Sequence, residues 1–236
     1  MAGYNFKNKK EVEEYLKKLY TEYSFGCLSE KNPEVCHLLG DYNEAILKNK
    51  EKSGEIYKQN CDNFNFARSC YKYARYNVTG EKNCEKNMKK AYQYMKKGCE
   101  FGDGAACLYM GMMIISKDDI GVEKNEVVIK EGLEMIRKAC YEMKEPRGCS
   151  ILGKMYLNGV KDFVAKDEKS AYTLFEKSCN DGDDSSACFT LAQMLGRGIG
   201  VEKNMELAHK FRKKAAEIEE DNRKNSEIKF QQGAFM

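Results

Sequence analysis

The stretch AYTLFEKSCNDGDDSSACFTLA, residues 171–192, decides the fold. Phe175 and Cys179 lie four residues apart, which places them on one face of a helix that ends near Cys179. Asn, Asp, Gly and Ser follow, and these residues favour turns and helix N-caps. A second cysteine, Cys188, opens another periodic segment that continues with Leu191. The stretch therefore predicts two helices joined by a short loop, with a cysteine on each side of the loop.

The same pattern recurs along the whole chain. Ten of the eleven cysteines fall into neighbouring pairs whose members are 9, 9, 8, 9 and 9 positions apart. The first members of these pairs are separated by 34, 38, 41 and 39 residues, which is the period of helical-hairpin repeats. A large residue stands four positions before each first cysteine: Tyr23, Tyr57, Met95, Ile136 and Phe175. A small residue stands four positions after each second cysteine and lets the partner helix approach closely: Gly40, Ala74, Gly111, Gly153 and Ala192.

The pattern predicts an all-α fold, a right-handed α-solenoid of five helical hairpins with a C-terminal capping helix. We expect a single solenoid over residues 1–220, with the repeats at about 9–47, 48–82, 86–118, 125–160 and 167–199. The capping helix is expected at 203–222, where Phe211, Ala215 and Ile218 recur on one face. Residues 223–236 are expected to form a polar, frayed tail.

Composition excludes several classes of function. The chain has 236 residues, 42% of them hydrophobic, 33% charged, and a net charge of only +3. Such an even balance does not suggest nucleic acid or an anionic membrane as the main partner. No stretch approaches the roughly 18 uninterrupted apolar residues of a spanning helix, and the first residues lack the apolar core of a secretory signal. We expect a monomer without a membrane span.

The cysteine spacing indicates structural disulfides rather than metal or redox sites. No Cys-x-x-Cys occurs, which removes the usual spacing of zinc knuckles, thioredoxin-type pairs and covalent haem attachment. Bridges between neighbours are therefore favoured, with metal binding and redox cycling as alternatives: Cys27–Cys36, Cys61–Cys70, Cys99–Cys107, Cys140–Cys149 and Cys179–Cys188. Each closes a loop of about ten residues, which the chain-entropy model values at about 2.5 to 3 kcal/mol.

Cys84 is the cysteine left over, and we expect it to be a free surface thiol in the loop between two repeats. Lys82 and Lys86 flank it, and their charges are expected to lower its pKa modestly. The alternative is a role for Cys84 as a haem ligand or redox group. His37 and His209, the two histidines of the chain, are the other weak candidates for haem. His37 is predicted to be a partly exposed helical residue rather than a ligand.

The sequence offers no catalytic or metal site. It contains no recognisable phosphate-binding loop, paired-carboxylate site or Ser/His/Asp arrangement. The sequon at Asn77 falls at a predicted helix end and is interpreted as a chance match. The abundant tyrosines are expected to serve the core and the concave face of the solenoid.

Several motifs identify a family resemblance. Residues 156–160 (Tyr-Leu-Asn-Gly-Val) running into 164–171 (Val-Ala-Lys-Asp-Glu-Lys-Ser-Ala) resemble the Sel1-like repeat, whose helices are TPR-like. The Gly-Val-Glu-Lys-Asn loops at 121–125 and 200–204 repeat part of that motif. A cysteine ending the first helix and another opening the second resemble the cysteine-rich branch of the family. Within this branch, segments 30–36, 69–72 and 78–80 resemble the animal cytochrome c oxidase assembly factors of this repeat type.

This resemblance implies a protein of the mitochondrial intermembrane space, oxidised on import by the disulfide relay and needed for the assembly of respiratory complex IV. It also implies an association with haem binding and with a thiol-reducing activity.

Two hypotheses of different classes follow. In the first, disulfide-stapled hairpins hold a client protein or assembly partner on the concave face without catalysis. In the second, free thiols or haem take part in redox or metallation steps. A secreted bacterial cysteine-rich repeat protein is a third alternative. Two histidines and five satisfied cysteine pairs favour the first.

Overall fold

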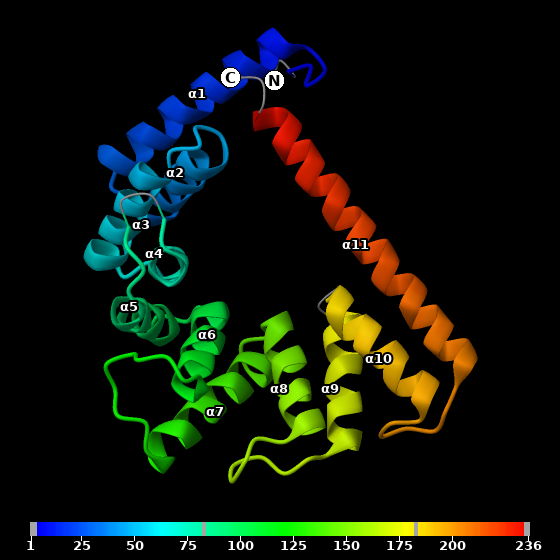
Figure 1. Cartoon of the computed structure of the whole chain (residues 1–236). Helices are drawn as coiled ribbons and strands as arrows, with labels where there is room; N and C mark the ends of the chain where they lie inside the picture. Colours follow the sequence, from blue (N-terminus) through cyan, green and yellow to red (C-terminus); the bar gives the residue numbers. More distant parts are fainter. Residues whose placement is uncertain (1–3, 82–83, 182–183, 234–236) are drawn as a thin grey trace. The chain divides into compact units, whose positions relative to one another are not determined.

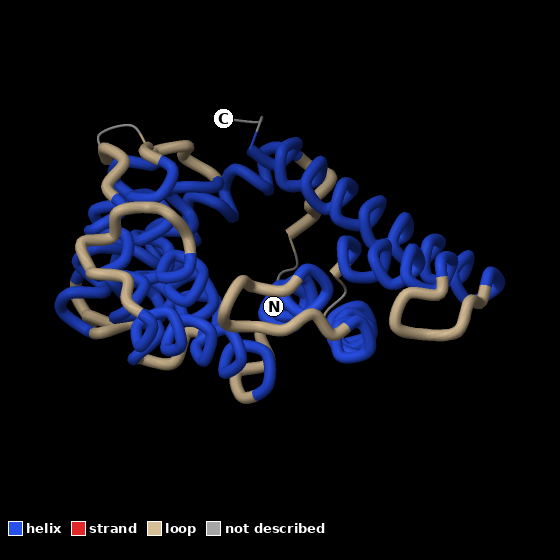
Figure 2. The backbone as a smooth tube through the Cα atoms, turned by 60° about the horizontal axis from the view of Figure 1, so that its bottom comes forward, coloured by secondary structure: helices blue, strands red, loops and turns tan. Residues whose placement is uncertain are grey.

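The computed structural model describes residues 4–81, 84–181 and 184–233. These residues form eleven α-helices and no named strand (Figures 1 and 2). The helices are α1 Lys9–Leu28, α2 Pro33–Ala45, α3 Lys50–Phe64, α4 Ala67–Thr79, α5 Met88–Glu100, α6 Gly104–Ile115, α7 Glu126–Tyr141, α8 Pro146–Asn158, α9 Glu168–Asp181, α10 Ser185–Arg197 and α11 Met205–Gly233. The predicted all-helical architecture of paired helices is confirmed.

The chain divides into two compact units. One contains α1–α5, up to Phe101, and the other contains α6–α10 together with α11 as far as Lys224. No helix of the described residues is both long enough and apolar enough to cross a bilayer.

Short polar side chains define where most helices begin. Asn49, for example, stands before α3, and its side chain accepts a hydrogen bond from the backbone N–H of Lys52. Asn or Asp caps other helices in the same way at positions 8, 32, 87, 103, 125, 167, 184 and 204. Each cap satisfies backbone donors that the first helical turn would otherwise leave unpaired, so the loop residues fix the start of the following helix.

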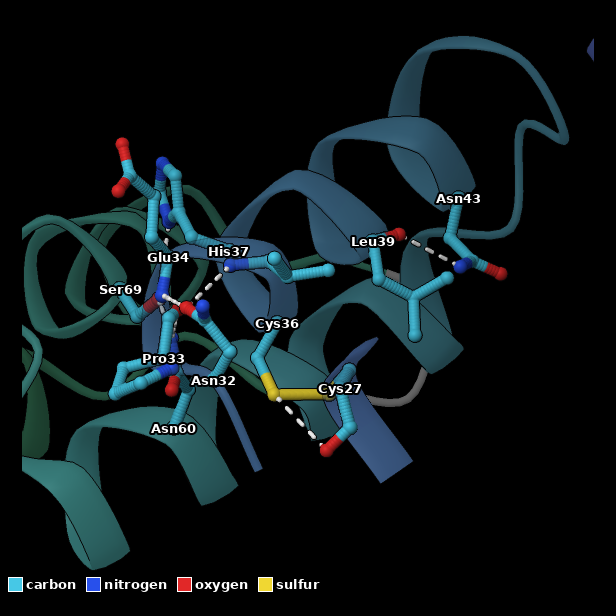
Figure 3. The surroundings of a disulfide bond; sticks show 11 residues. Cys27, Asn32, Pro33, Glu34, Cys36, His37, Leu39, Asn43, Asn60 and Ser69 are labelled. Carbon is cyan, nitrogen blue, oxygen red and sulfur yellow. Dashed lines mark hydrogen bonds between the residues drawn. A yellow bond between two sulfur atoms is a disulfide. The ribbon is translucent and has the colours of Figure 1, made fainter. Parts of the chain in front are cut away.

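Disulfides join the two helices of the hairpins. The structure contains the bridges Cys27–Cys36, Cys61–Cys70, Cys140–Cys149 and Cys179–Cys188, with Cα–Cα distances of 4.5 to 4.8 Å. Cys99 and Cys107 are also disulfide-bonded. Figure 3 shows the first bridge, where the last turn of α1 meets the first turn of α2. The predicted pattern of hairpins closed by disulfides is therefore confirmed as part of the fold.

Noncovalent packing is strongest between hairpins rather than within them. In three hairpins the second helix packs more extensively on the following helix than on its disulfide partner: α2 on α3, α4 on α5 and α8 on α9. A small residue makes this possible, because a Cβ added to Gly153 would lie 3.2 Å from the ring of Phe175. Gly40 faces the ring of Tyr57 in the same way, and Phe175 and Tyr57 are both fully buried.

The last helix is longer than the sequence predicted. Ala208, Phe211 and Ala215 of α11 join the core formed by α9 and α10, as expected of a capping helix. The expected tail from residue 223 is nevertheless helical as far as Gly233. Glu220 pairs with Arg223 at 2.8 Å and with Lys224 at 3.5 Å, and such i,i+3 and i,i+4 pairs support a helix. No Gly or Pro interrupts the chain between these residues and Gly233.

Candidate functional site

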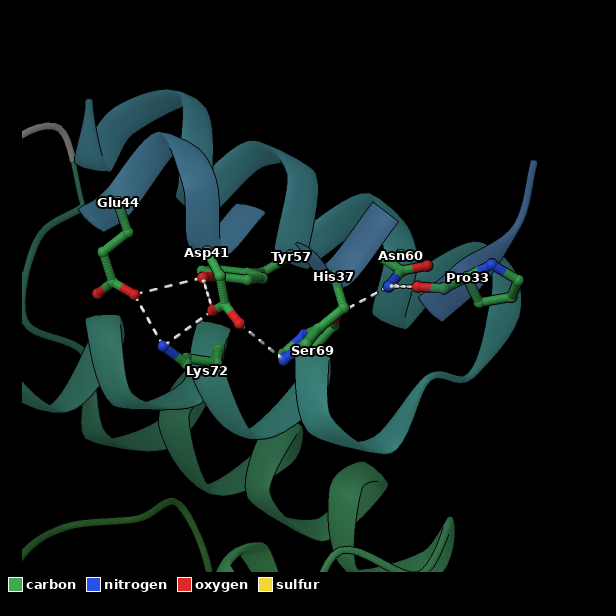
Figure 4. Close-up of polar contacts among 8 residues, drawn as sticks. All are labelled: Pro33, His37, Asp41, Glu44, Tyr57, Asn60, Ser69 and Lys72. Carbon is green, nitrogen blue, oxygen red and sulfur yellow. Dashed lines mark hydrogen bonds and ion pairs between the residues drawn. The ribbon is translucent and has the colours of Figure 1, made fainter. Parts of the chain in front are cut away.

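A group of buried and half-buried polar side chains lies where α2, α3 and α4 meet. We call it the α2–α4 polar cluster, and it consists of His37, Asp41, Glu44, Tyr57, Asn60, Ser69 and Lys72 (Figure 4). Its members come from two successive hairpins and form two hydrogen-bonded groups, which meet where His37 Nε2 lies 3.6 Å from Asp41. Buried polar groups must find partners to avoid a large desolvation cost, so this cluster is the strongest polar constraint in the first unit.

His37 occupies the centre of the cluster. Its side chain is 2% exposed, so the prediction of a partly exposed histidine was wrong. The imidazole packs at 5.5 Å from the ring of Tyr57 and at 5.4 Å from the ring of Phe66. The residue after the second cysteine of this hairpin thus points into the interface between hairpins, where neighbouring helices cover it.

Ser69 connects His37 to Asn60 through hydrogen bonds. The amide Nδ2 of Asn60 donates to the Ser69 hydroxyl at 2.8 Å and to the Pro33 carbonyl at 2.8 Å. Since Nδ2 can only donate, the Ser69 hydroxyl accepts this bond. The same hydroxyl lies 2.9 Å from Nδ1 of His37, whose other ring nitrogen, Nε2, lies 3.6 Å from Asp41. Burial disfavours the imidazolium ion and lowers the pKa of His37 to about 4.

The other end of the cluster is an ionic group that is half-buried. The Tyr57 hydroxyl donates to Asp41 at 2.6 Å, and the Lys72 ammonium lies 2.8 Å from Glu44 and 3.1 Å from Asp41. Burial alone would raise the pKa of Asp41, but the Tyr57 hydrogen bond and the Lys72 charge together lower it. Burial and the two carboxylates raise the pKa of Tyr57. The hydrogen bond of Tyr57 and the ion pairs of Lys72 hold α3 and α4 against α2.

Ser69, His37 and Asp41 form a Ser/His/Asp arrangement that the sequence did not suggest. His37 and Asp41 lie one turn apart on α2, and the packing of α4 on α2 brings Ser69 to them. Ser69 has no exposed surface, and its hydroxyl is already hydrogen-bonded to Asn60 and to His37. A nucleophile must reach its substrate, so this serine serves the packing of the helices and not catalysis.

Cys84 is a free cysteine in the loop between α4 and α5. Its backbone pairs with Glu81 through two hydrogen bonds of 2.8 and 2.9 Å, which close the loop. Burial raises the pKa of the Cys84 thiol, Glu81 raises it further, and Lys90 opposes them. The expected lowering of this pKa was therefore wrong, and the flanking Lys82 lies outside the described residues.

Cys84 and His37, the two haem candidates of the first unit, are not brought together. Cys84 lines a cavity of about 330 Å³, and His37 is not among the residues around it. His209 is exposed on α11 in the other unit. His37 would have to leave its bond to Ser69 and a buried position to bind iron, so it does not fit a haem ligand. Among the described residues, no three His, Cys, Asp or Glu side chains are placed to hold a metal ion.

Asn77 illustrates why the sequon has no role at this position. Its side chain is 1% exposed, and its Nδ2 donates to the Tyr73 carbonyl at 2.8 Å. Glycosylation requires an accessible asparagine, so the interpretation as a chance match agrees with the packing.

The chain is similar to known proteins in both sequence and structure. The family model described as Sel1 repeat matches residues 67–103, 104–142, 146–183 and 185–218. A Drosophila melanogaster protein named cytochrome c oxidase assembly factor 7 homolog is 36% identical, and the match covers 99% of each chain. Cytochrome c oxidase assembly factor 7 of Xenopus tropicalis is 35% identical over 92% of this chain and 94% of that protein. The crystal structure of a Sel1 repeat protein from Oxalobacter formigenes superposes with a TM-score of 0.70 at 25% identity, covering 90% of this chain and 83% of that one.

Proposed function

The chain belongs to the Sel1 repeat family, and we propose that it serves as an assembly factor for cytochrome c oxidase, respiratory complex IV. The observation that carries this proposal is the similarity to the fly assembly factor homolog, which extends over 99% of both chains. A similarity limited to the repeat pattern would support the fold alone. The full-length match also disfavours the alternative of a secreted bacterial protein.

The proposed location is the mitochondrial intermembrane space. Four bridges and the disulfide-bonded Cys99 and Cys107 require an oxidising environment, which the ordinary cytosol does not provide. An oxidising compartment next to the membrane that contains complex IV accounts for both the disulfides and the relatives' names. The disulfide relay of that compartment is then the partner that oxidises this chain.

The proposed mechanism is that of a scaffold that holds a client protein or assembly partner on the concave face of its repeats. The α2–α4 polar cluster supports this mechanism, because its buried side chains join helices of successive hairpins rather than form an accessible catalytic site. The alternative of a thiol reductase depends on Cys84, whose raised pKa disfavours the reactive thiolate at neutral pH.

Deletion of the gene in its source organism tests the proposed function. We expect a loss of assembled complex IV and of cytochrome c oxidase activity, with complex III activity unchanged, and full rescue by the wild-type chain. Normal complex IV in the deletion strain would refute the proposal. Protease added to intact mitochondria and to mitoplasts tests the location, since the chain should be degraded only after the outer membrane is opened.

Rescue with Cys84→Ser separates the scaffold from the redox alternative. The scaffold needs the disulfides but not this thiol, so the variant should restore complex IV as well as the wild type does. Rescue that fails with a folded, stable Cys84→Ser protein would favour the thiol-reducing role.

A further inference from the structure

A pocket of about 260 Å³ lies between α10 and α11 in the second unit. Ala192, Gly196 and Ala208 provide its apolar lining, and Met205 stands beside them with 63% of its surface exposed. Arg197, His209 and Arg212 also line it. We call it the α10–α11 pocket.

The repeat register explains why a pocket exists at this place. In three earlier helices, the residue eight positions after the N-cap is a large side chain without exposed surface: Tyr57 after Asn49, Met95 after Asn87 and Phe175 after Asp167. Phe175 fills the space beside Gly153, and Tyr57 fills the space beside Gly40. In α11 the N-cap is Asn204, and the eighth residue after it is Arg212.

Arg212 leaves open the space that an aromatic or aliphatic side chain fills elsewhere. Ala192 stands at the position of Gly153 and Gly40, four residues after the second cysteine of its hairpin, and both Ala192 and Arg212 line the pocket. Arg212 is exposed rather than buried against Ala192. The chain thus retains the small residue that makes room for a large side chain of the next helix. It supplies the cation of Arg212 where that large side chain would lie.

The charges around the pocket are not balanced. No Asp or Glu lines it, although the chain as a whole contains nearly as many acidic as basic residues. Throughout the described part of the chain, neither Arg197 nor Arg212 has an ion-pair partner, and His209 has none either. An arginine recognises a carboxylate with two parallel hydrogen bonds, which makes unpaired arginines beside an apolar surface complementary to such a group.

The size of the pocket favours a protein side chain as the occupant. Its volume of about 260 Å³ is below the roughly 300 to 1,000 Å³ typical of sites for small molecules and cofactors. We propose that the α10–α11 pocket binds a segment of a partner protein that presents a carboxylate next to an apolar side chain. The apolar group enters the space beside Ala192, and the carboxylate binds Arg197 and Arg212.

This inference deepens the proposed scaffold function and rests on it for the identity of the partner. It gives the scaffold a defined recognition site at the end of the repeat array. The binding chemistry itself is measurable on the purified protein, without complex IV.

Two short peptides test the inference on the purified, oxidised full-length protein. The probes are acetyl-Leu-Glu-Leu-amide and acetyl-Leu-Gln-Leu-amide, which differ only in the carboxylate. In ¹H–¹⁵N NMR titrations we expect the Glu peptide to shift amide signals of Gly196, Arg197, Met205 and His209. We expect it to bind about tenfold more tightly than the Gln peptide, because charge-assisted hydrogen bonds are the stronger ones.

Three variants make the test specific. The double variant Arg197→Gln/Arg212→Gln should abolish the preference for the Glu peptide. Arg212→Phe restores the large side chain of the other repeats and should prevent binding of both peptides. Lys210→Gln removes one positive charge from an exposed residue of α11 outside the pocket lining and should leave binding unchanged. Thermal unfolding checks that each variant is folded.

Absence of shifts around the pocket with the Glu peptide would overturn the inference. Equal affinity for the two peptides, or unchanged binding by the folded double variant, would overturn it as well. These outcomes are independent of the deletion experiment. A chain that binds neither peptide but is required for complex IV retains the proposed function and loses only this site.

Discussion

The buried imidazole of His37 predicts a specific dependence of stability on pH. The pKa of a histidine is near 6.5 in an unfolded chain, whereas burial lowers the pKa of His37 to about 4 in the folded protein. As the pH falls below 6.5, the unfolded chain therefore binds a proton that the folded chain excludes. Stability contributed by the neutral imidazole is present at pH 7.5 and is lost progressively as the pH approaches 4.

The magnitude follows from linkage between proton binding and unfolding. Between pH 7.5 and pH 5.0, the two pKa values give a loss of about 2 kcal/mol in the free energy of unfolding. That is a substantial share of the roughly 5 to 15 kcal/mol by which proteins are stable. The difference should appear in urea unfolding curves recorded at both pH values by far-ultraviolet circular dichroism, since the chain contains no Trp.

Carboxylates also titrate in this range, so the comparison between variants isolates the histidine. His37→Gln cannot gain a proton and should lose about 2 kcal/mol less than the wild type between the two pH values. His209→Gln is the matched control, because the other histidine is exposed, and it should follow the wild-type pH dependence. Equal pH dependence of His37→Gln and the wild type would refute the assignment of a buried, neutral His37.

Three further predictions concern the disulfides, the helix contacts and the leftover thiol. Replacing both Cys61 and Cys70 by Ser should lower the free energy of unfolding by about 2.5 to 3 kcal/mol in urea titrations, because the bridge no longer restrains the unfolded chain. An unchanged value would contradict this account. Gly111→Ala should lower the thermal midpoint, because the new Cβ would lie 2.5 Å from a backbone carbonyl oxygen of α7. The expected loss of stability is about 1 to 3 kcal/mol. A thermal midpoint equal to that of the wild type in calorimetry would argue against close packing at this contact. Intact-mass analysis after alkylation should show one adduct on the native wild type and none on Cys84→Ser, whose thermal midpoint should match the wild type; more than one adduct would mean that a paired cysteine is accessible.

The fold was predictable because its determinants are local and repeated. The cysteine spacing places a helix end and a helix start within ten residues, and the Asn and Asp caps mark the same boundaries. Four positions before a first cysteine, the large residue is buried wherever it faces a Gly, as Tyr57 and Phe175 are. Each of these relations joins residues of one helix or of adjacent helices, so a single sequence contains enough information to identify them.

The α2–α4 polar cluster was not predictable for the opposite reason. His37 and Ser69 are 32 residues apart, and no motif in the sequence links them. Whether a histidine next to a cysteine faces solvent or the neighbouring hairpin depends on how α2 packs on α3 and α4. The pKa of Cys84 shows the same limit, since flanking lysines are visible in the sequence but the burial of the thiol is not.

The alternation of disulfides and packed interfaces affects both the unfolding and the folding of the chain. Along the helices of each unit, a covalent link within a hairpin is followed by a noncovalent contact to the next hairpin. Reduction removes the first kind of link, and denaturation removes the second. We expect a reductant to open hairpins and to leave blocks such as α2 with α3 assembled, and a denaturant to separate those blocks and to leave the hairpins tethered. Because bridged cysteines such as Cys61 and Cys70 are only nine residues apart, an oxidase needs to meet only one hairpin at a time. Oxidation can thus proceed along an extended chain before its helices have packed, and each closed hairpin then offers a surface on which its neighbour folds.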